Sequence, residues 1–63
     1  MTELAHRRNE DVDVSLFWDR KHDRLLVLVE DIRAGDRFAI RPARDRALDV
    51  FNHPFAYARM ATN

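Results

Sequence analysis

Apolar and polar residues alternate along two stretches of this chain, 12–18 and 25–31, at the two-residue period of a β-strand. In each stretch one set of alternate positions is apolar throughout, and we expect both sets to face a common core. These inward sets are Val12, Val14, Leu16 and Trp18 in the first stretch and Leu25, Val27 and Val29 in the second.

The segment 19–24 lies between the two stretches, contains no apolar residue and is rich in turn formers, so it predicts an antiparallel hairpin. Placing Trp18 opposite Leu25 sets every inward residue against another inward residue, which makes the register self-consistent. A second turn is expected around Gly35, the only glycine of the chain, at a position that needs a positive φ.

A third strand is expected at 37–41, with Phe38 opposite Val29 on the inner face. The same register sets Arg37 opposite Glu30 on the outer face, where a cross-strand ion pair would fit.

The residues after Pro42 have the spacing of an amphipathic helix, because Ala47, Leu48 and Phe51 recur at intervals of three and four. Proline suits the first turn of a helix, since it has no N–H to donate and its φ is already helical. We therefore predict a helix over 43–53, followed by a short helical turn after Pro54.

These elements predict an α+β fold, a three-stranded antiparallel β-meander with one C-terminal helix packed on one face. Residues 1–11 are mostly polar and are expected to form a flexible N-terminal arm, 12–58 a single domain and 59–63 a tail. The expected core consists of Val12, Val14, Leu16, Trp18, Leu25, Val27, Val29, Phe38, Ile40, Ala47, Leu48 and Phe51.

The outer face of the predicted sheet is also apolar at its centre, which a chain of 63 residues with a single core does not need. Two explanations remain open: one of the chain's own termini covers this face, or a protein partner does, which includes a second copy of the chain. The candidate interface residues are Phe17, Leu26, Leu28, Ala39, Arg37 and Arg41.

The composition favours self-association. A domain this short buries only about 60% of its unfolded surface and often needs an additional support, and the absence of cysteine excludes disulfides and thiolate metal sites. A homodimer is the support left most open. No apolar run approaches the roughly 20 residues that a membrane span requires, and the first residues lack the apolar region of a signal peptide, so a cytoplasmic protein is expected.

An alternative interpretation is a nucleic-acid-binding accessory factor that uses basic hairpin loops. Its candidate contacts are Arg20, Lys21, Arg24, Arg33 and Arg37. Acidic residues share the same loops, and the formal net charge is +0, which disfavours phosphate binding. Trp18 could stack on a base, but its alternation with Val14 and Leu16 predicts a core position.

No constellation of catalytic residues is recognisable, so an enzyme is not expected. Ser15 is the only serine and lies within a predicted strand, and there is no cysteine nucleophile or glycine-rich phosphate loop. The histidines, His6, His22 and His53, are too dispersed in the sequence for a local ligand set, so neither a metal nor another cofactor is expected.

Two segments, Phe17-Trp18-Asp19 and 46–58 with its His-Pro-Phe-Ala-Tyr sequence, resemble small uncharacterised proteins of actinobacterial type. That resemblance covers most of 12–58 and implies no activity, cofactor or partner. The sequence thus leads to a small non-enzymatic module that binds a protein or itself through an apolar sheet face.

Overall fold

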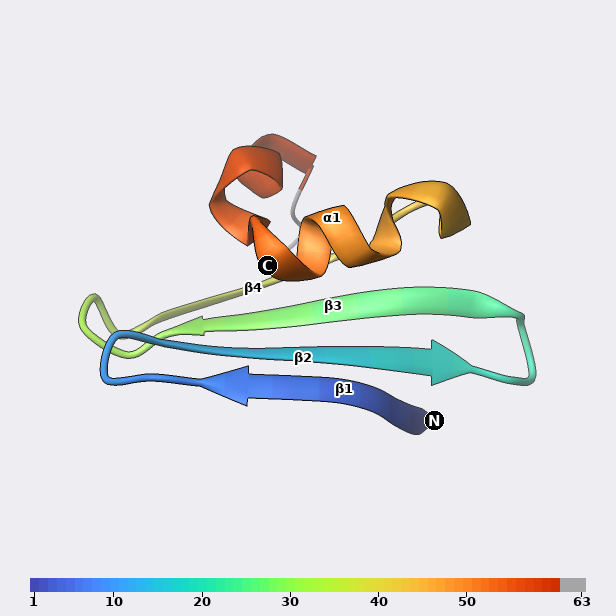
Figure 1. Ribbon diagram of the computed structural model, residues 1–63, viewed down its shortest axis with the longest axis horizontal. Coiled ribbons are helices and arrows are strands. Elements are labelled where there is room, and N and C mark those ends of the chain that lie inside the picture. Colours follow the sequence, from blue (N-terminus) through green and yellow to red (C-terminus); the bar gives the residue numbers. More distant parts are fainter. Residues whose placement is uncertain (61–63) are drawn as a thin grey trace.

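The computed structural model describes residues 1–60 and shows a four-stranded antiparallel sheet covered on one face by short helices (Figure 1). The strands follow one another in space in chain order, β1-β2-β3-β4. The elements are β1 (Thr2–Arg8), β2 (Val12–Asp19), β3 (Arg24–Asp31), β4 (Asp36–Ile40), the 3₁₀ helix η1 (Arg44–Arg46), the α-helix α1 (Ala47–Asn52) and the 3₁₀ helix η2 (Pro54–Met60).

The register predicted for β2, β3 and β4 is confirmed. Trp18 pairs with Leu25 across β2 and β3, and Val29 pairs with Phe38 across β3 and β4. Gly35 has a φ of 73° and donates its backbone N–H to the carbonyl of Asp31, as expected for the left-handed position of a tight turn.

The predicted number of strands is wrong, because the segment expected to be a flexible arm contains β1. This strand pairs antiparallel with β2 along most of its length, and a bulge between Glu3 and Ala5 shifts its register. The bulge moves the inward side from one set of alternate positions to the other. The sequence of β1 therefore shows no regular alternation of apolar and polar residues, although its backbone pairs with β2 as a strand.

The predicted helix over 43–53 is also wrong in its length and phase. Residues 44–46 form the 3₁₀ helix η1, and the α-helix begins only at Ala47. The buried stripe of α1 consists of Ala47, Val50 and Phe51, whereas Leu48 is 67% exposed. The predicted stripe with Leu48 and the observed stripe with Val50 both have the spacing of one helix face, but Val50 lies on the side of α1 that meets the sheet. The short helical turn predicted after Pro54 corresponds to η2.

The core lies between the inner sheet face and α1. Its buried members are Val14, Leu16, Val27, Val29, Ile40, Ala47, Val50 and Phe51, and the partly buried residues packed against them are Ala5, Val12, Leu25, Phe38 and Tyr57.

Trp18 was expected in this core but is only partly buried, at the end of β2. Its indole Nε1 donates a hydrogen bond of 3.0 Å to the carboxylate of Asp23. The guanidinium of Arg20 lies 5.8 Å from the centre of its ring, at the distance of a cation–π contact. Trp18 thus packs with residues of the β2–β3 turn.

Arg7 joins the unexpected strand to the helical layer. Its guanidinium Nη2 donates to the backbone carbonyl of Phe51 at 2.9 Å and to that of Asn52 at 3.2 Å, while Nε donates to the Phe51 carbonyl at 3.2 Å. The guanidinium also lies 5.5 Å from the centre of the Phe51 ring. A cation therefore satisfies the free carbonyls at the C-terminal end of α1, where the helix dipole favours positive charge.

The helix η2 packs on the same side of the sheet as α1. The rings of Phe55 and Phe38 meet edge to face with centroids 5.8 Å apart, and the Tyr57 hydroxyl donates a hydrogen bond to Asp49 of α1. The part of the predicted tail at 61–63 lies outside the described residues. Among residues 1–60, no helix is long and apolar enough to cross a membrane.

Candidate functional site

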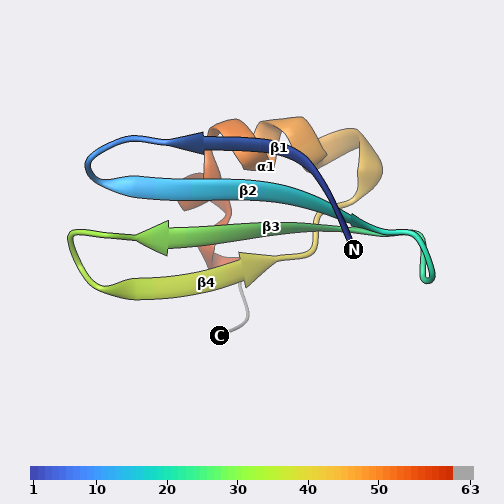
Figure 2. The same cartoon turned by 90° about the horizontal axis from the view of Figure 1, so that it is seen from below.

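The face of the sheet opposite the helices is open throughout the described part of the chain. Figure 2 looks onto this face, with all four strands in front and the helical layer behind them. The N-terminal segment lies beside β2 as an edge strand, and η2 contacts the other side of the sheet through Phe38. Neither segment covers the outer face, so within residues 1–60 the first of the two explanations fails.

The apolar centre of this open face comes from adjacent strands. Phe17 pairs with Leu26 across β2 and β3, and Leu28 pairs with Ala39 across β3 and β4. Leu28 is 42% exposed, and the other three side chains are partly buried against one another and their neighbours. Most of the predicted interface is therefore contiguous, with Arg37 at one end of the patch and Arg41 immediately beyond the end of β4.

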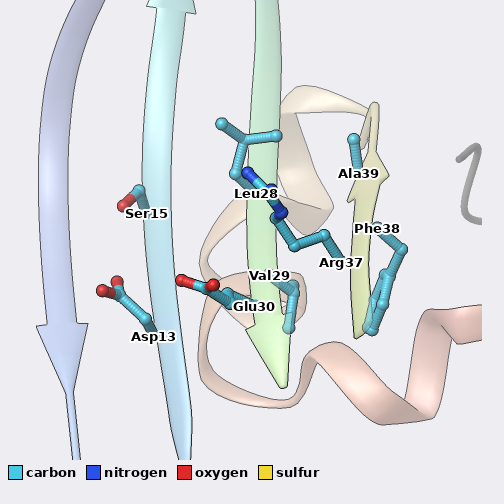
Figure 3. Close-up of a pocket in the computed structure, with 8 residues that line it drawn as sticks. All are labelled: Asp13, Ser15, Leu28, Val29, Glu30, Arg37, Phe38 and Ala39. Atoms are coloured by element: carbon cyan, nitrogen blue, oxygen red, sulfur yellow. The ribbon is translucent and has the colours of Figure 1, made fainter. Parts of the chain in front are cut away.

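A hollow of about 380 Å³ lies next to Leu28 on this face (Figure 3). Its walls combine the apolar side chains with a row of charged ones. The lining residues are Asp13, Ser15, Leu28, Val29, Glu30, Arg37, Phe38 and Ala39.

The charged row does not form the ion pair expected from the sequence. Arg37 and Glu30 are cross-strand partners, but the Arg37 side chain runs alongside Leu28, and the Glu30 carboxylate points toward β2 and Asp13 (Figure 3). Asp13 is the direct partner of Glu30 on β2, so two carboxylates face each other across the strands. Such a pair of like charges is unfavourable unless cations offset it.

Two side chains from β1 contact the Asp13 carboxylate. His6 Nε2 lies 2.6 Å from one of its carboxylate oxygens, and Arg8 Nε lies 3.9 Å from the other. Within the described residues, no basic nitrogen lies within 4.0 Å of the Glu30 carboxylate oxygens. It is an acidic group at the edge of an apolar surface, and its cross-strand neighbour Arg37 does not pair with it.

The strand β1 also brings a histidine close to an aspartate and a serine of β2, the three residue types of the catalytic triad in hydrolases. His6 is hydrogen-bonded to Asp13 and lies opposite Ser15 in the register. Nucleophilic catalysis would need a hydrogen bond between the serine and the histidine and free N–H donors for an oxyanion. In the described structure no bond joins Ser15 to His6, and Ser15 lies on β2, which has a paired strand on each side. The sequence does not predict this neighbourhood, because β1 has no regular apolar alternation.

The basic residues of the nucleic-acid alternative do not form one surface. Arg20, Lys21 and Arg24 lie at the β2–β3 turn, whereas Arg33 lies at the β3–β4 turn and Arg37 near it. These turns are separated by the length of β3, eight residues or about 26 Å. Arg33 also contacts Asp11 at 3.3 Å.

The β2–β3 turn is organised by its own aspartates. Asp19 accepts hydrogen bonds from the backbone N–H groups of Lys21 at 3.1 Å and His22 at 3.4 Å, and it lies 2.9 Å from the His22 ring nitrogen Nδ1. The hydrogen bond with the His22 side chain lowers the pKa of Asp19. Asp23 has a φ of 50° and binds both Trp18 and Arg44. These groups are engaged with one another, and residues 1–60 contain no cluster of three potential metal-ligating side chains.

No family model, curated protein or solved structure matches this chain.

Proposed function

We propose that this protein is a small non-enzymatic binding module whose open sheet face packs against another protein, either a second copy of the chain or a different one. One observation carries the proposal: the apolar face around Leu28 is covered neither by the helices nor by the terminal segments that the structure describes. Sheets commonly bury a second apolar face by packing on another layer about 10 Å away.

The surroundings of the patch support a protein partner more than a nucleic acid. An apolar centre formed by Phe17, Leu26 and Leu28 is bordered by charges of both signs, as in the core and rim of protein interfaces. A nucleic acid would select for a continuous basic surface. The basic side chains of this chain are instead divided between opposite ends of the sheet.

A photo-crosslinking experiment tests the proposal. Ala39 lies beside Leu28 on the open face, and a photoreactive phenylalanine analogue is introduced in its place. In cells that produce the chain, we expect it to yield a discrete crosslinked product whose mass identifies the partner. The substitution Leu28→Asp should remove this product, because it places a charge at the centre of the apolar contact.

Leu48→Asp is the matched control. Leu48 is even more exposed than Leu28 but lies on α1, on the other side of the molecule. The control variant should retain the crosslink, and both variants should retain a native circular dichroism spectrum. A crosslink that survives Leu28→Asp, or that forms equally from position 48, would overturn the proposal.

A further inference from the structure

We propose that the partner of the open face is a second copy of this chain, packed with its strands reversed about a two-fold axis that passes between Leu26 and Leu28. This inference rests on the proposed function, and it names the partner and its orientation. It starts from β3, the strand that supplies most of the outward apolar side chains.

The outward side chains of β3 are self-complementary when the strand is reversed. In order they are Arg24, Leu26, Leu28 and Glu30, because their alternate neighbours face the core. A two-fold axis perpendicular to the strand, halfway between the two leucines, brings Leu26 over Leu28 of the second copy. The same axis brings Arg24 over Glu30 of the second copy, and two such pairs arise by symmetry.

Each member of this charged pair has a cross-strand neighbour of opposite charge, Asp19 for Arg24 and Arg37 for Glu30, but forms no ion pair with it. Neither Arg24 nor Glu30 belongs to any ion pair that joins described residues. Glu30 also faces the like charge of its direct partner Asp13 on β2. A cation from a second copy would therefore relieve a local repulsion as well as form a new pair.

The charge of the whole molecule is polarised in the same sense. The end of the sheet at the β2–β3 turn, together with η1, carries an excess of basic residues, and the end at the other two turns carries an excess of acidic ones. At the first end are Arg20, Lys21, Arg24, Arg41, Arg44 and Arg46 against Glu3, Asp19, Asp23 and Asp45. At the second are Glu10, Asp11, Asp13, Glu30, Asp31 and Asp36 against Arg7, Arg8, Arg33 and Arg37.

Reversal of the strands sets the basic end of one copy over the acidic end of the other at both ends of the interface. A two-fold axis parallel to the strands would instead set like ends together. The long axis of the molecule is 33 Å, so the two ends of one copy lie farther apart than the screening length of about 8 Å. Each end therefore interacts mainly with the end of the other copy that faces it across the interface. The polarity thus selects the reversed orientation.

The strands β2 and β1 tolerate this arrangement. Asp19 and Asp13 of β2 approach each other across the interface, but each already has a histidine partner, His22 and His6 respectively. On β1, Glu3 comes over His6 of the second copy, which is a favourable contact. In aligned packing of two twisted sheets the strands cross at about 30°. At this angle the leucine pairs at the centre of the interface remain in contact.

The size of the face sets the expected affinity. Four strands of five to eight residues present a projected area of about 440 Å², since strands lie about 4.8 Å apart and rise about 3.3 Å per residue. A stable specific complex buries about 800 Å² of accessible surface on each partner. This face is smaller than that and falls among weak, transient interfaces, so we expect a reversible dimer with a dissociation constant of micromolar order.

Charge reversal in the purified chain tests the orientation by sedimentation equilibrium. Arg24→Glu and Glu30→Arg should each raise the dissociation constant at least about tenfold, because each places two like-charged pairs in the interface. The double variant Arg24→Glu/Glu30→Arg exchanges the two charges and should return the constant to within about threefold of the original. Arg46→Glu, a reversal in η1 away from the open face, is the control for net charge.

Each outcome separates this inference from the proposed function. A dimer that Leu28→Asp abolishes but that the double variant does not restore would overturn the reversed orientation and leave the proposed function standing. A chain that remains monomeric at millimolar concentration, while position 39 crosslinks to a different protein, would overturn only the choice of a second copy. Self-association that persists in Leu28→Asp would overturn both.

Discussion

The link between Arg7 and the end of α1 gives the sharpest prediction about stability. The substitution Arg7→Met keeps an unbranched side chain over the Phe51 ring and removes the donors. The carbonyls of Phe51 and Asn52 then lose their charged partner at the C-terminus of a helix of only six residues. Because α1 supplies the cover of the core, the loss should act on the whole domain.

The magnitude follows from the contacts. A hydrogen bond from a charged donor contributes about 1.5–3 kcal/mol, and a cation at a helix C-terminus adds about 0.3–1 kcal/mol. The two bonds to the Phe51 carbonyl share one acceptor and are partly buried, and the bond to Asn52 is exposed. We therefore expect a loss of about 2 kcal/mol in the free energy of unfolding, near the lower limit of these values taken together.

Urea and thermal unfolding followed by circular dichroism measure this loss. A domain of this length has a total stability of about 3–9 kcal/mol, and 2 kcal/mol corresponds to a fall in Tm of about 8–16 °C. The protein should be dilute, because association stabilises the folded state. The stability of Arg7→Lys should lie between that of the original chain and that of Arg7→Met, since an ammonium keeps the charge but cannot bind two acceptors as the guanidinium fork does.

Arg8→Met is the matched control from the next position of β1. Arg8 lies on the open face and reaches Asp13 only at 3.9 Å, so its loss should change the free energy of unfolding by less than about 0.5 kcal/mol. If Arg7→Met and Arg8→Met agree within that margin, Arg7 does not hold α1 on the sheet, and the reasoning is refuted.

Two further predictions concern the helix phase and the pH dependence. Val50→Ala should cost about 2 kcal/mol in urea unfolding because Val50 is fully buried, whereas Leu48→Ala should change stability by less than about 0.5 kcal/mol; the reverse order would refute the observed phase of α1. Because the pKa of Asp19 is lowered in the folded state from the ordinary 3.8, its bond to His22 stabilises the fold above that pH, and this contribution is lost as the pH falls through the lower folded pKa. Asp19→Asn should therefore weaken the acid dependence of stability between about pH 5 and about pH 3, measured by urea unfolding at several pH values, and an unchanged slope would contradict the assignment.

The register of β2, β3 and β4 could be predicted from the sequence because side chains alternate with a period of two. A shift of one residue would turn every inward valine of β3 toward solvent, so only one pairing buries both inward sets. The positive φ of Gly35 was predictable for a similarly local reason, since a tight turn needs a residue without a Cβ. The open face follows from the same alternation: once Val27 and Val29 face inward, Leu26 and Leu28 must face outward.

Tertiary structure decided the features that depend on contacts far apart in the chain. β1 has little apolar signal of its own and a bulge that breaks its period, so only its pairing with β2 defines it. The phase of α1 depends on which side meets the sheet, because Leu48 and Val50 are both apolar and only one can be buried. Arg7 at the end of α1 and His6 beside Asp13 lie on opposite faces of β1. Local sequence carries periodicity, but the partner of an edge strand, a helix end or a charged side chain is set by what the folded chain places next to it.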